Sequence, residues 1–382
     1  MRRCVKCLLP ETHETISFDD AGICNVCRSH EVKQQTDWNA RRTELDALIG
    51  EHRDRGEYDC IVPFSGGKDS TFALWYLVAT YGLKPLVVTF DHGFMRPRVL
   101  ENAKRTMRRL GVAHRVHTPS WSVVRQLMLQ SLRDKGDFCW HCHTGIFAYP
   151  MQVAIETGTS LVVWGEQSAE YTAYYTHADD EEVDEERFNR INTLGISSSD
   201  MFLRLGGSVS RRDLAPFTYP DQSRLRELGL RSVCLGSYVE WDTARQVEII
   251  KRELGWEEDE VENVPPQYGY EKIECYVQGV RDYIKYLKRG YSRPSHLAAI
   301  DLRRERISHH DARRMIDEYE GKRPPSLEIF LEMTGLSDEE FHAIALQHVV
   351  SPWVPEVPVT VGRRTHDYGQ WSREPTLPEQ RR

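Results

Sequence analysis

The sequence contains no apolar run that approaches the roughly 18–20 residues needed to span a bilayer. Its first residues, MRRCVKCLLPETHE, are partly basic but have no sustained apolar core, so we expect no secretory signal. An excess of basic residues is also missing. The net charge is −8, which argues against a nucleic-acid partner because phosphate contacts need a positive face. These absences predict a cytoplasmic protein with neither a membrane nor a nucleic acid as its partner.

Nine cysteines are present, and without a secretory signal they indicate a reducing compartment, where Cys-x-x-Cys pairs usually serve metal or redox chemistry. The first four form two such pairs, Cys4 with Cys7 and Cys24 with Cys27. Two thiolate pairs at this spacing can surround one tetrahedral Zn²⁺ and fold a segment too small to have its own core. Because four ligands leave no open position, we expect a structural zinc ribbon in residues 1–30.

Strands and helices are expected to alternate from residue 58 onward. The apolar runs YDCIVPF, KPLVVTFD, AHRVHTP and SLVVWGE are the expected strands, and STFALWYLVATYG and RPRVLENAKRTMRRLG have helical periodicity. This alternation predicts an α/β fold with a doubly wound parallel sheet, in which ligands bind outside the carboxyl ends of the strands. Ser65, Asp91 and Glu166 fall at or just after strand ends, so we expect them to share one crevice.

We expect five units along the chain. They are a zinc-binding unit (1–30), a connector helix (31–57), the sheet domain (58–260), a helical C-terminal region (261–350) and an irregular tail (351–382).

Three local patterns refine this division. In the C-terminal region, Ser308-x-x-Asp311 and Ser337-x-x-Glu340 predict helix starts. The acidic run at 178–187 predicts a solvated loop or helix start.

A loop rich in glycine and serine, Ser65-Gly66-Gly67-Lys68-Asp69-Ser70, lies between an expected strand and an expected helix. Glycines let backbone N–H groups approach an anion, and the helix start that follows favours phosphate. The loop lacks the Walker A spacing. It closely resembles the SGGxDS signature of the PP-loop, or N-type ATP pyrophosphatase, superfamily, whose fold is adenine nucleotide alpha hydrolase-like. Those enzymes split ATP between the α and β phosphates and adenylate a carbonyl or amide oxygen.

The resemblance implies that this loop binds ATP and Mg²⁺. Asp69 would help to position the metal, and Lys68 would neutralise charge. The remaining loop residues would cradle the pyrophosphate leaving group: Ser65, Gly66, Gly67 and Ser70.

Two further positions follow later strands. Asp91 lies where the second strand of the superfamily passes the adenosine portion of the nucleotide; the alternative is a carboxylate that caps the turn DHGF. Gly165-Glu166 resembles the position that faces the α-phosphate and the substrate. Glu166 would there hold Mg²⁺ or orient the nucleophile, and a turn carboxylate is again the alternative.

A second set of cysteines, Cys139-x-x-Cys142 and the distant Cys234, forms another candidate metal site. It resembles the arrangement in iron–sulfur-dependent PP-loop tRNA thiolases, in which three cysteines leave one iron open. Three soft thiolates favour an iron–sulfur cluster or zinc over magnesium. His141 and His143 alternate with the pair, so zinc stays open as an alternative, as do thiols without a metal.

Longer downstream stretches carry a more specific resemblance. Together with the N-terminal cysteines, RFNRINTLGISSSDMF (187–202), GSYVEWD (236–242) and the stretch 283–324, from YIKYLKRGYSRPSH to EYEGKRP, resemble the N-acetyl sugar amidotransferase family. That family acts in bacterial surface-polysaccharide, lipopolysaccharide and flagellin-glycan pathways. The resemblance implies an enzyme that converts the acetamido group of a nucleotide-linked sugar to an acetamidino group. ATP would activate the amide oxygen, and ammonia would displace it.

The sequence shows no glutaminase signature. Cys4 is not at a mature N-terminus, and no class I Cys-His-Glu pattern is evident. The resemblance therefore implies a separate glutaminase and a cyclase-like partner that channels ammonia. We expect the anionic groups of the sugar to contact a basic helix that carries Lys285, Lys288, Arg289 and Arg293, and a solvated helix face is the alternative.

A sulfur transferase of the tRNA thiolase kind, with an iron–sulfur cluster on Cys139, Cys142 and Cys234, is the second interpretation. The acidic composition and the C-terminal stretches count against it. The segment Pro294-Ser295-His296 departs from the Thr-Asp-like continuation expected in the amidotransferase family, which leaves the acceptor sugar open. The sequence does not decide between a monomer and a homo-oligomer.

Overall fold

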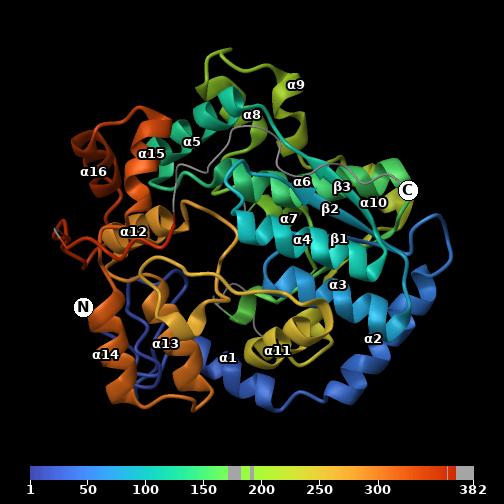
Figure 1. The fold of residues 1–382 in the computed structure, drawn as a ribbon, viewed down its shortest axis with the longest axis horizontal. Helices are drawn as coiled ribbons and strands as arrows, with labels where there is room; N and C mark the ends of the chain where they lie inside the picture. The colour runs from blue at the N-terminus through green and yellow to red at the C-terminus, as the bar shows by residue number, and fades with distance from the viewer. Residues whose placement is uncertain (171–181, 190–192, 359, 367–382) are drawn as a thin grey trace.

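A parallel sheet forms the centre of the computed structural model, which describes residues 1–170, 182–189, 193–358 and 360–366. Its five strands lie in the order β3-β2-β1-β4-β5, and every neighbouring pair is parallel (Figure 1). The strands are β1 (Cys60–Pro63), β2 (Pro85–Phe90), β3 (Ala113–His117), β4 (Leu161–Trp164) and β5 (Arg231–Cys234). The α/β fold with a parallel sheet is therefore confirmed.

The sheet is buried on both faces, as its nearly continuous apolar strands require. In β1, Val62 joins the core under α3 and α11, whereas Ile61 packs on the opposite side with residues of α6 such as Met151. The order of strands reverses at β1, where β2 and β4 are its two neighbours. The loops that follow β1 and β4 thus meet at the carboxyl edge, where ligands of such sheets bind.

Helices of the sheet domain begin and end close to their predicted positions. α3 starts at Lys68, two residues earlier than the periodicity indicated, and ends before Gly82 in the left-handed conformation. The helices up to β5 are α1 (Asn25–Gln34), α2 (Trp38–His52), α3 (Lys68–Tyr81), α4 (Pro97–Leu110), α5 (Trp121–Lys135), α6 (Trp140–Thr157), α7 (Glu185–Arg187), α8 (Ser198–Arg204), α9 (Arg211–Leu214) and α10 (Gln222–Leu228), with short 3-10 turns at η1 (Ser168–Glu170) and η3 (Ala215–Phe217).

The predicted connector contains more than one helix. α1 starts directly after Cys24 and ends at Gln34, so it crosses the predicted boundary at residue 30. α2 follows with Asp37 as its N-cap. The side chain of Asp37 accepts hydrogen bonds from the backbone N–H groups of Asn39 and Ala40.

The C-terminal region is helical, and most of it lies on the left in Figure 1. The predicted caps are confirmed: Ser308 accepts from the N–H of Asp311, and Ser337 forms a capping box with Glu340. The elements after β5 are η4 (Leu235–Ser237), α11 (Thr243–Leu254), η5 (Pro266–Tyr268), α12 (Gln278–Arg289), α13 (Arg293–Arg303), α14 (His309–Tyr319), α15 (Ser326–Thr334) and α16 (Asp338–Leu346).

One segment of this region reaches the carboxyl edge of the sheet. The N–H of Tyr276 donates to the carbonyl oxygen of Phe94 at 2.9 Å, and the N–H of Arg96 donates to that of Glu274 at 3.4 Å. The chain just before α12 is therefore fixed beside the residues that follow β2.

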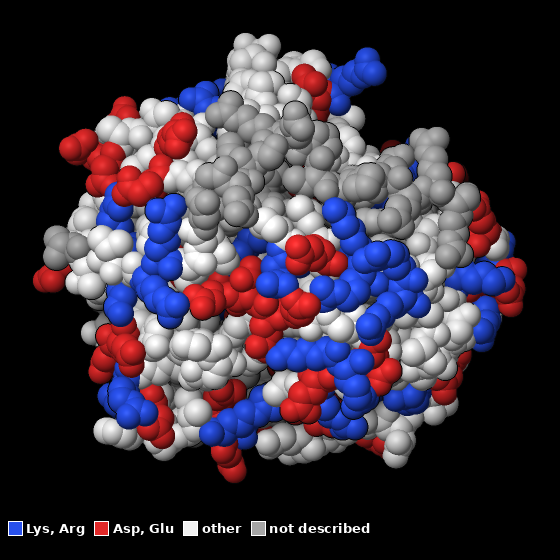
Figure 2. All heavy atoms as spheres, in the orientation of Figure 1, with Lys and Arg blue, Asp and Glu red and all other residues white. Residues whose placement is uncertain are grey.

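The described surface carries charges of both signs. Figure 2 shows Lys and Arg beside Asp and Glu on the face viewed, and the basic helix α4 is partnered, since its Arg105 lies 3.0 Å from Glu257. Of the acidic run 178–187, residues 178–181 lie outside the described residues, Glu182 pairs with Arg231, and Asp184 caps α7. No described helix has both the length and the apolar composition needed to cross a membrane.

Candidate nucleotide site and cysteine cluster

The glycine and serine loop forms a tight turn between β1 and α3. The side chains of Ser65 and Ser70 lie 3.2 Å apart, and the N–H of Ser65 donates to the Ser70 hydroxyl at the same distance. Gly67 is the N-cap of α3, and no side chain caps this helix start. A Cβ at Gly67 would lie 1.8 Å from Glu274 Oε1, so a carboxylate lies directly against the loop.

A cavity of about 350 Å³ opens beside this loop. Ser65, Asp69 and Ser70 line it, and Gly165 and Glu166 line it from the end of β4. The expectation that Ser65 and Glu166 share a crevice is therefore confirmed. Asp91 is not among the lining residues, although its neighbour His92 is.

Lys68 and Asp69 lie at the start of α3 and contact each other. Lys68 Nζ is buried, 2.7 Å from Asp69 Oδ2 and 3.0 Å from Glu271 Oε2, and Lys68 is not among the residues that line the cavity. Burial opposes ionisation of Glu271, but the Lys68 ammonium lowers the pKa of this carboxyl to about 2. The other oxygen of Asp69, Oδ1, is buried and has no hydrogen-bond partner among the described residues. A buried, unpartnered carboxylate oxygen at a phosphate-type loop fits Mg²⁺, which prefers oxygen ligands.

The two other carboxylates expected at the site differ in their surroundings. Asp91 is buried, and its Oδ1 accepts from the N–H of Gly93 at 2.8 Å, which is the turn-capping geometry that the sequence left open. Glu166 lines the cavity, with its carboxylate 3.9 Å from Lys272 Nζ. Of these two, Glu166 is the carboxylate in position to meet a ligand.

The basic residues expected to bind the sugar have other partners. Lys288 donates to the carbonyl oxygen of Lys135 at the end of α5, and Arg289 donates to that of Thr12. The remaining two form ion pairs: Lys285 with Glu14 at 3.5 Å, and Arg293 with Glu271 and Asp282, both at 3.3 Å. None of the four lines the cavity.

Sequence reasoning missed the residues that the C-terminal region contributes to the cavity. Lys272, Glu274, Cys275 and Arg281 line it, and Glu274 Oε1 lies 3.5 Å from Ser65 Oγ. No sequence motif singled out this segment. Its position follows from the pairing of residues 274–276 with 94–96, a contact between parts of the chain far apart in sequence.

The first four cysteines are gathered as predicted. Cys4, Cys7, Cys24 and Cys27 are fully buried, and their sulfur atoms all lie within 4.8 Å of one another. The Sγ atoms are 3.9 Å apart for Cys4 and Cys27 and 3.6 Å apart for Cys7 and Cys24. Four sulfur donors in one buried group fit a tetrahedral ion such as Zn²⁺.

The second cysteine set is not gathered in this way. The N-terminal cluster is the only group of three or more such ligands that meets this spacing within the described ranges. Cys142 and Cys234 line the cavity, but Cys139 packs in the apolar cluster of α5, α12 and α15. Cys139 is the N-cap of α6, and Cys142 lies inside this helix.

The comparisons with known proteins concern parts of the chain. Residues 268–370 match the family model of the C-terminal domain of LPS biosynthesis proteins of the WbpG-like kind. This match supports a family of glycan biosynthesis, and the matched range contains the segment that lines the cavity beside the loop.

A stretch of 94 residues, 24% of this chain, is 32% identical to an uncharacterized protein of Methanocaldococcus jannaschii. The match covers 34% of the length of that relative.

Proposed function

We propose that this protein is an ATP-dependent amidotransferase that converts the acetamido group of a nucleotide-linked sugar to an acetamidino group. One observation carries the proposal. Ser65, Asp69 and Ser70 of the SGGKDS loop line a single cavity with Glu166 and with a segment that matches a domain of LPS biosynthesis proteins. The loop supports chemistry on a nucleotide, and the matched domain supports a sugar as the substrate.

The proposed reaction has two steps. The amide oxygen attacks the α-phosphorus of ATP, the bond to the bridging oxygen breaks, and pyrophosphate leaves. Ammonia then adds to the activated carbon, the C–O bond breaks, AMP leaves with that oxygen, and a proton is released. An amide needs this activation because it is a poor electrophile and its oxygen is a poor leaving group.

The side chains of the cavity suit these steps. Backbone N–H groups of the loop, with Ser65 and Ser70, would bind the pyrophosphate, whose charge grows as it leaves. Asp69 Oδ1 and Glu166 offer carboxylate oxygens for Mg²⁺, which would neutralise phosphate charge and leave the amide oxygen and the α-phosphorus in reach of one another. Arg187, Lys272 and Arg281 are the lysine and arginine side chains of the lining, and they would contact anionic groups of the sugar nucleotide.

The ammonia would come from a separate glutaminase with a cyclase-like partner, because the chain has no glutaminase signature. The exact sugar and its nucleotide stay open.

Mass spectrometry of candidate UDP-N-acetyl sugars incubated with Mg-ATP and ammonium tests the proposal. Replacement of a carbonyl oxygen by NH lowers the mass of the sugar, and AMP and pyrophosphate should form in equal amounts. ADP and phosphate as the nucleotide products would contradict it.

A sulfur transferase is the second candidate, favoured by the cavity positions of Cys142 and Cys234. Thiolation would raise the mass of the acceptor instead of lowering it. Anaerobic purification with an iron and sulfide assay and a visible spectrum separates the two. A colourless, iron-free protein in which Cys234→Ala retains full amidotransfer would exclude the sulfur transferase.

A further inference from the structure

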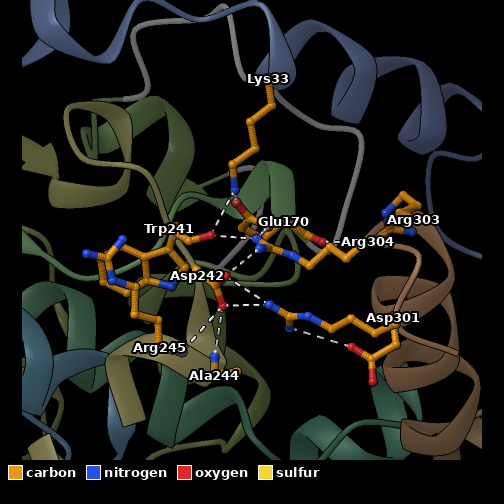
Figure 3. Close-up of polar contacts among 10 residues, drawn as sticks. Lys33, Glu170, Trp241, Asp242, Ala244, Arg245, Asp301, Arg303 and Arg304 are labelled. Carbon is orange, nitrogen blue, oxygen red and sulfur yellow. Dashed lines mark hydrogen bonds and ion pairs between the residues drawn. The ribbon is translucent and has the colours of Figure 1, made fainter. Parts of the chain in front are cut away.

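The turn that carries Glu166 is joined to the N-terminal cysteine unit by a buried ion pair. Glu170, the last residue of η1, follows Glu166 by four positions, and its carboxylate contacts Lys33 Nζ of α1 (Figure 3). The two side chains are only 6% and 10% exposed. Lys33 also donates to the carbonyl oxygen of Trp241 at 3.1 Å, so one cation holds two segments from the carboxyl edge of the sheet.

Two arginines at the C-terminal end of α13 hold Glu170 from a second direction. Arg304 lies 3.8 Å from Glu170 and donates to the carbonyl oxygen of Trp241, and Arg303 donates to the carbonyl oxygen of Glu170 at 3.3 Å. Figure 3 shows the arginines and Lys33 converging on Glu170 and Trp241 from different parts of the chain. Glu170 is therefore the point where the cysteine unit, the sheet domain and the C-terminal region meet.

The turn between Gly165 and Glu170 rests on the segment that Lys33 also holds. The N–H of Gly236 donates to the carbonyl oxygen of Gly165 at 3.0 Å, and Gln167 Nε2 donates to Ser237 Oγ at 2.5 Å. A Cβ at Gly236 would lie 3.1 Å from the backbone nitrogen of Gln167, so the two segments touch along their backbones. Loss of Lys33 would remove one of the two cations that contact both Glu170 and Trp241, and would leave Arg304 as the other.

We propose that the N-terminal cysteine unit positions a side chain of the cavity. Lys33 of this unit holds Glu170 and thereby fixes Glu166. The reaction part of this inference rests on the proposed function of Glu166. The link to the metal is short: α1 begins after Cys24, contains Cys27 and carries Lys33 in its last turn. Zinc held by Cys24 and Cys27 at the start of this helix would therefore fix the position of Lys33 at its end.

Hydrogen exchange of the full-length protein tests the positioning without any assay of activity. Lys33→Met removes the cation, and Lys6→Met is the control, because Lys6 pairs with Glu31 on the same helix at 2.9 Å through side chains that are 40% and 35% exposed. We expect the amides of residues 165–170 to exchange about tenfold faster in Lys33→Met, the change that a coupling of about 1.4 kcal/mol produces. Lys6→Met should match the wild type.

Unchanged exchange in Lys33→Met would overturn the proposal, as would equal acceleration in both variants, which would mean a general loosening of the cysteine unit. If Lys33→Met does not fold, Glu170→Gln removes the same charge interaction from the other side. Lys33→Arg keeps the cation and should restore most of the protection.

Kinetics distinguishes this inference from the proposed function. With faster exchange at 165–170, we expect kcat to fall by on the order of 10–100-fold while ATP binding stays near the wild-type value, because the misplaced group is Glu166 and not the loop. Faster exchange with unchanged kcat would support the mechanical link and contradict the role proposed for Glu166.

Discussion

Alanine should have different effects at Gly66 and Gly67, although the two glycines are neighbours. Gly66 has a φ of +80°, and a Cβ there would lie 2.7 Å from Val99 Cγ1. The left-handed conformation costs a residue with a side chain about 1–2 kcal/mol. Overpacking adds about 1–3 kcal/mol. We therefore expect Gly66→Ala to lower the free energy of unfolding by about 2–5 kcal/mol.

Gly67 has a φ of −76° and a ψ of 174°, which alanine adopts without strain. A Cβ would meet Glu274 Oε1, the end of a flexible side chain that can move aside. Gly67→Ala should therefore change the free energy of unfolding by less than about 1 kcal/mol. The new methyl group would fill the space where an anion contacts the loop, so Mg-ATP affinity should fall about 10–100-fold, as expected when charge-assisted hydrogen bonds are lost.

Urea unfolding followed by tryptophan fluorescence measures the first effect, and calorimetric titration with Mg-ATP measures the second. Gly50→Ala in α2 is the control, because a Cβ at Gly50 has no atom within 4 Å. A Gly67→Ala variant that binds Mg-ATP as tightly as the wild type would refute the loop as the phosphate cradle. A Gly66→Ala variant as stable as the wild type would refute the backbone argument.

Three further predictions concern the loop, the cysteine cluster and a buried carboxyl group. Asp69→Asn and Ser65→Ala should leave the fold intact and slow the formation of AMP and pyrophosphate by on the order of 10²–10³; wild-type rates in a coupled pyrophosphate assay would contradict this. Cys24→Ser should lose zinc and destabilise the N-terminal unit, because metal binding there is folding free energy, and the argument fails if elemental analysis finds no zinc in the wild type. Burial raises the pKa of Glu262 to about 7, against hydrogen bonds donated by Ser326. The neutral carboxyl group contributes its full stability below the unfolded pKa, and this contribution is lost as pH rises through the folded pKa. The free energy of unfolding of the wild type should therefore fall by up to about 3 kcal/mol between about pH 4.5 and pH 8, whereas Glu262→Gln should not show this loss. The same dependence of stability on pH in both proteins would contradict the assignment.

The elements of the sheet could be predicted because their signals are local. β1 and β2 are continuous apolar runs, and α3 ends at Gly82, where the left-handed conformation is easiest for glycine. The cysteine cluster was predictable for the same reason, since Cys4, Cys7, Cys24 and Cys27 lie within one short segment and their spacing alone indicates one ion.

The C-terminal wall of the cavity could not be predicted, because contacts over long sequence separations create it. The basic pattern around Lys288 and Arg293 suggested one anion-binding helix, but the structure divides it in two. Lys288 lies in α12 and contacts the end of α5, and Arg293 starts α13 and pairs with acidic residues. Arg281, two turns before Lys288 on the same face of α12, reaches the cavity instead. Periodicity can show which residues share a face, but only packing decides which part of that face meets the ligand.

Glu274, in the matched C-terminal domain, places a carboxylate directly against the glycine and serine loop. Its carboxylate lies against Gly67 and near Ser65, where the proposed phosphates would bind, while Glu271 of the same segment is paired with Lys68. Two like charges cannot share the loop without a cation between them. ATP bound at the loop as proposed would therefore either move Glu274 or bring Mg²⁺ to it, and in both cases the segment before α12 would change its interactions. By linkage, a ligand that binds this segment would change the affinity for ATP by the same factor by which ATP changes the affinity for that ligand. A sugar bound against this segment and ATP bound at the loop would therefore influence each other's affinity without touching the rest of the sheet.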